Sequence, residues 1–125
     1  MIEIVDCKQE HLAFIYSSWL QSFKLYQKYV SSKDYYTGQH KVIDNILKRD
    51  NVSVLVTEDG IVGYICYNRD TVHWLYIKEC FRGFKFGSVL LSQCCPDVKQ
   101  YSHYSRAWNY ICLLYTSDAA DDREV

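Results

Sequence analysis

The sequence lacks the features that mark membrane-spanning and secreted proteins. No apolar run in its 125 residues approaches the roughly 20 residues needed to cross a bilayer. The N-terminal segment 1–6 is acidic and strand-like, whereas a secretory signal has a basic start and a continuous apolar stretch. We therefore expect a cytosolic protein. The formal net charge of −1 gives no reason to expect attraction to nucleic acid or to a membrane.

Signatures of metal sites and redox pairs are also missing. The chain has six cysteines and four histidines, but no C-x-x-C pair and no zinc-binding spacing. In a cytosolic chain we expect the cysteines to be free thiols that pack as small apolar side chains. Apolar residues make up 49% of the chain, which is long enough for one compact domain with a real core and too short for two.

The N-terminal part predicts a strand followed by a helix. Residues 2–6 form the expected strand, and the apolar spacing over residues 8–24 is that of an amphipathic helix. Asp6 is the expected cap of this helix, with Gln9 as its capping-box partner. Residues 24–38 lack a clear period, so we interpret them as a loop with at most one helical turn. The aromatic side chains of this loop either face a substrate or pack beneath it.

The central part predicts an antiparallel hairpin. Residues 52–58 and 61–67 are rich in β-formers, and Asp59-Gly60 between them suits a tight primed turn in which both central residues have positive φ. Residues 71–78 then form a third strand, after another turn. This hairpin is the strongest local prediction that the sequence makes.

The remaining segments predict two more helices and a last strand. One helix is expected over residues 39–49. Another begins at Gly87 and must end near Cys95, because Pro96 cannot continue a helix. Residues 100–111 begin a further strand. The resulting order of elements predicts an α+β fold, with helices packed on a mostly antiparallel sheet.

A basic loop between strand 71–78 and the helix from Gly87 is the candidate functional segment. The first turn of a helix has unpaired N–H groups and the positive end of the helix dipole, so it attracts phosphate. Arg82 adds a permanent positive charge, and Gly83 and Gly87 allow the backbone to approach an anion closely. The segment therefore predicts a phosphate site.

Residues 82–91 read R-G-F-K-F-G-S-V-L-L and resemble the cofactor loop of GNAT-superfamily N-acetyltransferases. That family carries Arg/Gln-x-x-Gly-x-Gly/Ala between its fourth strand and its third helix. Lys85 replaces the first glycine of the pattern, so its Cβ is expected to crowd the ligand while its N–H and ammonium attract it. The segments 73–78, 81–84 and 102–105 also resemble small acetyltransferase-like proteins of phages and bacteria.

The resemblance implies a GNAT (acyl-CoA N-acyltransferase) fold and direct transfer of an acetyl group from acetyl-CoA, the co-substrate, to an amine on a small molecule or a peptide. It implies that the end of the fourth strand holds the pantetheine arm through Tyr76, Ile77 and Lys78. It also implies that the loop holds the pyrophosphate, through Arg82, Gly83, Phe84, Lys85, Phe86, Gly87 and Ser88. The alternative is a GNAT-like module that binds CoA or another partner, such as a phage interaction protein, without catalysis.

His73 is the candidate general base. Strand alternation places it on one face with Thr71, Leu75 and Ile77. Some family members carry a basic carboxylate on this face, and a free histidine titrates near pH 6.5. The alternative is a half-buried histidine that packs beside Trp74. Glu79 is a second candidate, or else a solvated loop charge, and His103 either faces the acceptor or makes a structural hydrogen bond.

The C-terminal residues resemble no domain element. Residues 112–122 match the translation of a transposon-type sequencing adapter, and a natural acidic tail is the alternative. We therefore predict a partial GNAT domain over residues 1–111 and a non-native tail over residues 112–125. The C-terminal strands and helix of the fold would be missing. Tyr115 is excluded as a proton donor, and the chain as written is expected to be inactive and poorly stable.

Overall fold

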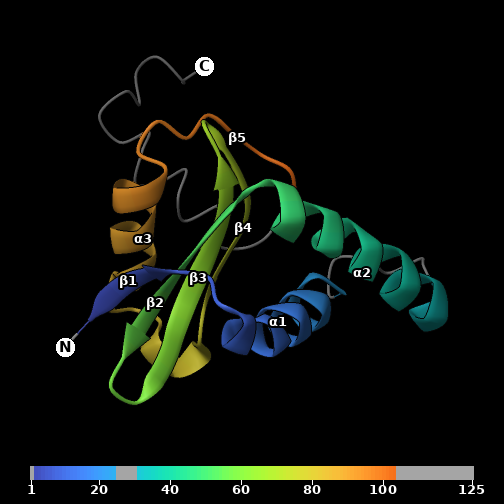
Figure 1. The fold of residues 1–125 in the computed structure, drawn as a ribbon, viewed down its shortest axis with the longest axis horizontal. Helices are drawn as coiled ribbons and strands as arrows, with labels where there is room; N and C mark the ends of the chain where they lie inside the picture. Colours follow the sequence, from blue (N-terminus) through green and yellow to red (C-terminus); the bar gives the residue numbers. More distant parts are fainter. Residues whose placement is uncertain (1, 25–30, 104–125) are drawn as a thin grey trace.

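The computed structural model describes residues 2–24 and 31–103. A single sheet with the strand order β1-β2-β3-β4-β5 forms its centre (Figure 1). The strands are β1 (Glu3–Asp6), β2 (Asn51–Thr57), β3 (Gly60–Asn68), β4 (Thr71–Ile77) and β5 (Gln100–Tyr101). Neighbouring strands are antiparallel except for β4 and β5, which are parallel. The predicted α+β fold with a mostly antiparallel sheet is confirmed.

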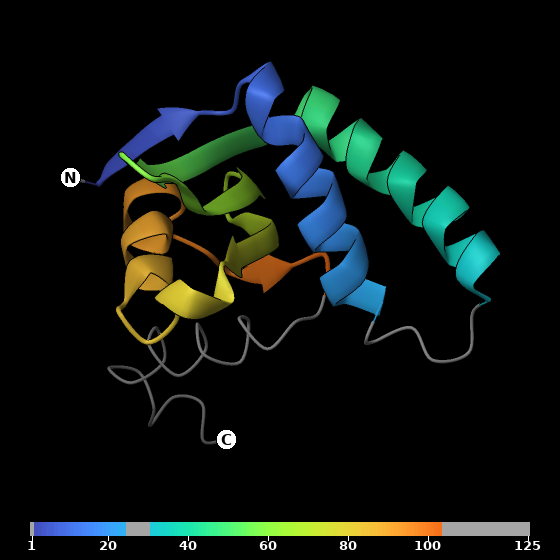
Figure 2. The same ribbon diagram turned by 90° about the horizontal axis from the view of Figure 1, so that it is seen from below.

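Helices cover both faces of the sheet (Figures 1 and 2). The helices α1 (Leu12–Lys24) and α2 (Ser32–Arg49) lie on one face, and α3 (Phe86–Cys94) lies on the other. Short 3₁₀ turns precede α1 and follow β4, at Gln9–His11 and Glu79–Phe81. None of the helices in the described part of the chain is long and apolar enough to cross a membrane.

The start of the first helix differs from the prediction. Asp6 does not cap a helix, because it pairs with Ser53 in the ladder between β1 and β2. Lys8 precedes the 3₁₀ turn instead, and its N–H donates to Nδ1 of His11 at 3.0 Å. Pairing with the neighbouring strand therefore takes precedence over the capping-box pattern at this position.

The helix α2 begins at Ser32, so the prediction of a loop over residues 32–38 is wrong. Ser31 caps this helix, and its hydroxyl accepts from the N–H of Asp34 at 3.2 Å. Tyr35 is buried, and its hydroxyl donates to the carbonyl oxygen of Leu20 at 2.6 Å. The cap and this tertiary contact stabilise a first turn that has no apolar period of its own.

The predicted hairpin is confirmed, but its turn differs in detail. Thr57 pairs with Gly60, so Glu58 and Asp59 occupy the turn itself. Positive φ occurs at Gly60, with a value of 126°, and not at Asp59. The prediction of a two-residue primed turn with positive φ at both Asp59 and Gly60 is therefore wrong.

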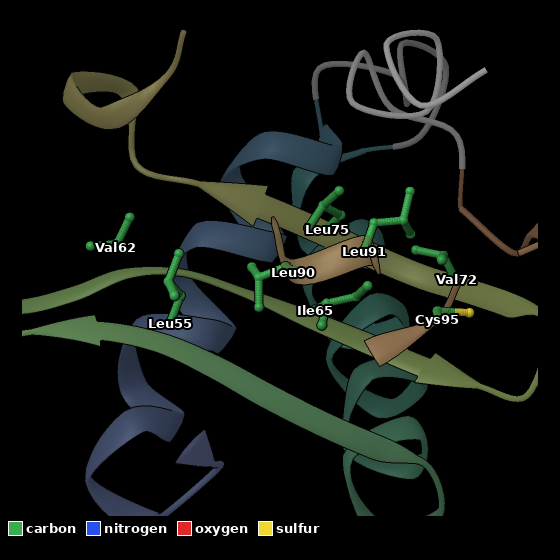
Figure 3. Close-up of a cluster of buried hydrophobic side chains, with 8 residues drawn as sticks. All are labelled: Leu55, Val62, Ile65, Val72, Leu75, Leu90, Leu91 and Cys95. Atoms are coloured by element: carbon green, nitrogen blue, oxygen red, sulfur yellow. The ribbon is translucent and has the colours of Figure 1, made fainter. Parts of the chain in front are cut away.

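Two apolar clusters lie on opposite faces of the sheet. The α3-side core contains Leu55, Val62, Ile65, Val72, Leu75, Leu90, Leu91 and Cys95 (Figure 3). The α1/α2-side core contains Ile15, Trp19, Ile43, Ile46, Val54, Tyr64, Cys66 and Trp74. Cys66 and Cys95 are buried free thiols in these cores, as predicted, whereas Cys80 is an exposed free thiol.

The C-terminal predictions are only partly covered by the structure. The strand expected over residues 100–111 is present as β5, at Gln100–Tyr101. Residues 104–111 and the predicted non-native tail over residues 112–125 lie outside the described residues. Those predictions therefore remain predictions.

Candidate functional site

The loop between β4 and α3 contains two residues in the left-handed region. Gly83 has a φ of 91°, and Lys85, which caps α3, has a φ of 67° and a ψ of 19°. This conformation disfavours a residue with a Cβ by roughly 1–2 kcal/mol. Lys85 occupies the position where the GNAT pattern has glycine, so the backbone geometry gives a steric reason for glycine at that position.

The first turn of α3 offers hydrogen-bond donors. The N–H of Val89 donates to the carbonyl oxygen of Lys85 at 3.1 Å, which is the first bond of the helix. The N–H groups of Phe86, Gly87 and Ser88 precede that bond and have no partner within the helix. The hydroxyl oxygen of Ser88 is buried and has no hydrogen-bond partner among the described residues. A buried hydroxyl beside such amides fits an oxygen-rich anion.

The helix α3 packs closely against the end of β4. A Cβ added to Gly87 would lie 3.8 Å from a methyl carbon of Leu75 and 3.9 Å from a side-chain carbon of Ile77. Arg82 folds back over the same strand, because its Nε donates to the carbonyl oxygen of Ile77 at 2.8 Å. The guanidinium carbon of Arg82 lies 5.3 Å from the ring centroid of Tyr76. The loop, the helix and the strand end therefore form one continuous surface.

The backbone of β4 directs polar groups away from β3 next to this surface, and of these the carbonyl oxygen of Ile77 already accepts from Arg82. The N–H of Lys78 donates to the carbonyl oxygen of Val62 at 2.8 Å, so Ile77 and Gly63 form a non-hydrogen-bonded pair. Because such pairs alternate with hydrogen-bonded pairs, the N–H and C=O groups of Leu75 and Ile77 point away from β3.

Tyr76 has a different position from the one expected of it. By the same alternation, its backbone groups bond to those of Tyr64 in β3. On the other side of β4, β5 pairs with Thr71 and Val72. Within the described residues, the edge of β4 over residues 73–77 is thus not covered by a paired strand.

The other predicted loop residues are spread along the surface. Phe84 is 66% exposed, and Phe86 packs edge-on against Phe81 with ring centroids 6.0 Å apart. Glu79 is exposed in the 3₁₀ turn after β4, at the opposite end of the strand from His73. The structure therefore does not bring these two candidate bases together.

His73 lies at a β-bulge. Trp74 pairs with Cys66, but Val72 pairs with Tyr67, so β4 contains one more residue than β3 at this point. A bulge of this kind kinks the strand and redirects the side chains around it.

The bulge makes the prediction of a common face wrong. The expected set was Thr71, His73, Leu75 and Ile77. Instead, Val72 and Leu75 both belong to the α3-side core, while Trp74 belongs to the α1/α2-side core. The extra residue shifts the alternation by one position, which separates His73 from the side chains that follow it.

A polar chain extends from His73 in both directions. Nε2 of His73 lies 2.8 Å from Oδ2 of Asp50, and Nδ1 lies 2.7 Å from Oγ of Ser102. That Oγ lies 2.8 Å from Nδ1 of His103, whose Nε2 lies 3.0 Å from Nε2 of Gln39. The polar chain thus joins α2, β4 and the segment after β5.

The carboxylate end of the polar chain is buried. The side chain of Asp50 is 1% exposed and that of His73 is 12% exposed. Oδ1 of Asp50 accepts from Nδ2 of Asn68 at 3.0 Å, and a guanidinium nitrogen of Arg49 lies 3.6 Å from Oδ2. A cavity of about 270 Å³ adjoins these groups and is lined by Arg49, Asp50, Asn68, Arg69, Asp70, Thr71 and His73.

The other end of the polar chain lies among aromatic rings. The ring centroid of His103 is 5.3 Å from that of Trp19 and 4.9 Å from that of Phe23. Burial, and secondarily the charge of His73, lowers the pKa of His103 to about 4. His103 is therefore neutral at neutral pH and makes a structural hydrogen bond to Gln39.

Comparison with solved structures connects this geometry to a known fold. YjaB of Escherichia coli, in its apo form, matches with a TM-score of 0.64 and 20% identity, over 93% of this chain and 80% of that one. PaiA N-acetyltransferase of Thermoplasma acidophilum, in complex with coenzyme A, matches with a TM-score of 0.59 and 17% identity, over 94% and 88%. A GNAT-family acetyltransferase of Staphylococcus aureus Mu50 matches with a TM-score of 0.58 and 14% identity, over 94% and 83%. The chain has the GNAT fold.

At these identities the likeness concerns the fold. No protein-family model and no curated protein matches the sequence. Within the GNAT fold, β4 and α3 are the fourth strand and third helix between which the family pattern lies. The polar chain brings together His73 and His103, which the sequence singled out, with Gln39, Asp50 and Ser102, which it did not. No group of three metal-ligating side chains occurs in the described residues.

Proposed function

We propose that the protein transfers an acetyl group from acetyl-CoA to an amine acceptor. The observation that carries this proposal is the buried hydroxyl of Ser88, which has no partner among the described residues, in the first turn of α3, whose amides have no partner within the helix. A buried polar group without a partner costs free energy, and an oxygen of a bound ligand would supply the missing partner. The coenzyme A bound to the Thermoplasma acidophilum relative is consistent with such a ligand.

In this proposal, the amides of Phe86, Gly87 and Ser88 bind the pyrophosphate of the cofactor. The pantetheine arm then lies along the edge of β4 over residues 73–77, which no described strand covers. There the N–H and C=O of Leu75 and the N–H of Ile77 point away from β3 and can pair with its amides, whereas the carbonyl oxygen of Ile77 already accepts from Arg82. Acetyl-CoA supplies the activated thioester.

The chemistry would take place where β5 separates from β4. From Ile77 to His73 the strand spans four residues, or about 13 Å at 3.3 Å per residue. An arm that follows this edge from the helix therefore points toward His73 and Ser102. The acceptor must lose a proton to attack, and the histidine next to Asp50 is the basic group at that point.

The second candidate is a GNAT-like module that binds without catalysis, such as a phage interaction protein. The left-handed backbone of Lys85 favours this alternative, because its Cβ stands where the fold ordinarily has no side chain. This alternative predicts that no amine is acetylated.

Isothermal titration with acetyl-CoA tests the proposal, with Ser88→Ala and Ser92→Ala as a matched pair. Ser92 lies in the same helix, and its hydroxyl donates to the carbonyl oxygen of Val89. We expect Ser88→Ala to raise the dissociation constant about tenfold, as the loss of one hydrogen bond to a charged group would. Ser92→Ala should leave it unchanged.

The results separate the two candidates. If the chain does not bind acetyl-CoA, the proposed cofactor site is wrong. Both the acetyltransferase and a non-catalytic module that binds CoA are then excluded. Binding without acetylation of a panel of amines is expected both of the non-catalytic module and of an acetyltransferase chain that is inactive as written, whereas acetylation of an amine excludes the non-catalytic module. Turnover of acetyl-CoA by the 125-residue chain would contradict the sequence-based prediction that it is inactive as written.

A further inference from the structure

The hydrogens of the polar chain can be assigned from its two ends. Nε2 of Gln39 is an amide nitrogen and donates, so Nε2 of His103 accepts. A neutral imidazole has one N–H, which places the hydrogen of His103 on Nδ1 and makes Oγ of Ser102 its acceptor. The hydroxyl hydrogen of Ser102 is then directed to Nδ1 of His73. The remaining hydrogen of His73 is on Nε2, which lies at an ion-pair distance of 2.8 Å from Oδ2 of Asp50 without a hydrogen bond to that oxygen among the described residues.

This arrangement leaves neither ring nitrogen of His73 free to contact the amine that receives the acetyl group. Its ring is 12% exposed, and both nitrogens already have partners within 2.8 Å. Ser102, in contrast, is exposed and follows the last residue of β5, next to the part of β4 that no described strand covers. A substrate can therefore reach His73 through the hydroxyl of Ser102.

We propose that Ser102, His73 and Asp50 form a proton relay in which the hydroxyl of Ser102 contacts the acceptor amine. In one step the N–H bond of the ammonium breaks and a new O–H bond forms on Ser102. At the same time the original O–H bond of Ser102 breaks and an N–H bond forms on Nδ1 of His73. The amine gains its lone pair and His73 becomes an imidazolium. This role rests on the proposed function, but the arrangement of the relay does not.

Asp50 and His103 are positioning residues in this relay. The buried carboxylate of Asp50 lies 2.8 Å from Nε2 of His73 and places a negative charge next to the imidazolium that the relay forms, and Asn68 fixes the carboxylate. His103 donates to Ser102 and so directs the hydroxyl hydrogen toward His73. The other charged groups near His73 are Arg49, at the end of α2, and Arg69 and Asp70, which line the adjoining cavity.

The relay predicts a reactive serine whether or not acetyl-CoA binds. A fluorophosphonate forms a P–O bond and loses fluoride at a serine hydroxyl when a base takes the hydroxyl proton. We expect the intact chain to be labelled once, at Ser102. Ser102→Ala should abolish labelling, and Ser92→Ala should not affect it.

Asp50→Asn tests the positioning role, because it keeps the shape of the side chain and an oxygen for Asn68. We expect labelling to slow at least about 100-fold, since general-base catalysis contributes about 10²–10⁴-fold. Circular dichroism checks that each variant is folded.

Three results would overturn the relay: an unlabelled wild-type chain, labelling that persists in Ser102→Ala, or a labelling rate that Asp50→Asn leaves unchanged. Failure of acetyl-CoA to bind in the titration would instead remove the proposed function and leave the labelling result to decide the relay. Where acetyl transfer is measurable, Ser102→Ala should lower its rate with acetyl-CoA affinity unchanged. Equal rates in the two proteins would also contradict the relay.

Discussion

The two faces of the sheet carry polar sites that are made of different groups. On the α3 side, the candidate cofactor surface consists mainly of backbone N–H and C=O groups of one continuous segment, residues 75–88. On the α1/α2 side, the polar chain consists of side chains from Gln39, Asp50, His73, Ser102 and His103. A backbone site depends on chain geometry, so a local motif can specify it. A site of side chains depends on how distant segments pack.

The largest expected effects come from truncating one core residue on each face. Trp19 is fully buried, and its ring stacks on Trp74 at 5.5 Å and contacts His103. We expect Trp19→Ala to lower the free energy of unfolding by about 3–5 kcal/mol, and Leu90→Ala, in the α3-side core, by about 2–5 kcal/mol. Urea denaturation measures both values.

The same two variants test whether the two faces behave independently when the imidazole of His103 is also observed. Trp19→Ala removes a wall of the His103 site, so the imidazole resonances of His103 should move in NMR spectra and its pKa should rise toward the ordinary value. Leu90→Ala should leave these resonances in place. If both variants shift His103 equally, the two faces do not behave as separate sites.

The sequence predicted the elements that have a strong local signal. The hairpin, the strand β4 and the helix α3 follow from β-rich runs, a turn dipeptide and a proline that ends the helix. The first turn of α2 was missed because its main stabilising contact, from Tyr35 to Leu20, lies outside the helix. The local sequence was therefore sufficient to predict an element where its turn or breaking residues and its apolar spacing indicate the same structure.

The side-chain site was beyond the reach of local pattern. His73 and Ser102 are 29 positions apart, and Asp50 was not singled out because a lone aspartate after a helix usually faces solvent. The bulge at His73 has no glycine or proline to mark it. Residue type alone made His73 and His103 candidates. Their connection through Ser102 could be seen only once the register of β4 with β3 and with β5 was known.

A smaller effect is expected from the titration of His103. Its pKa is lowered from 6.5 to about 4 in the folded protein, mainly by burial. Between these values the unfolded chain binds a proton that the folded chain does not, so stability falls as pH decreases from 6.5 to about 4. Above pH 6.5 both states are neutral at this residue, and the contribution is constant.

His103→Gln should reduce this pH dependence, because glutamine does not titrate. Urea denaturation at pH 7 and pH 5 measures the difference for each protein. Asp44, whose pKa is lowered by hydrogen bonds from Tyr16 and Lys48, contributes to acid sensitivity below its ordinary value of 3.8 and thus outside this window. If His103→Gln loses as much stability between pH 7 and pH 5 as the wild-type protein does, another group is responsible for the pH dependence.

The smallest effect is expected at Lys85, where the backbone site departs from the family pattern. Lys85→Gly relieves the strain of a left-handed residue with a Cβ, so we expect the free energy of unfolding to rise by about 0.5–1 kcal/mol. Lys85→Ala removes the same ammonium but keeps the strain, and should change stability by less than about 0.5 kcal/mol. Since both variants lose the charge, any difference in their acetyl-CoA affinity reports the Cβ alone. Neither should change fluorophosphonate labelling of Ser102, because that site is built on the other face. A change in labelling would show that the geometry of the α3 loop reaches the polar chain, and the separation of the two faces would then be wrong.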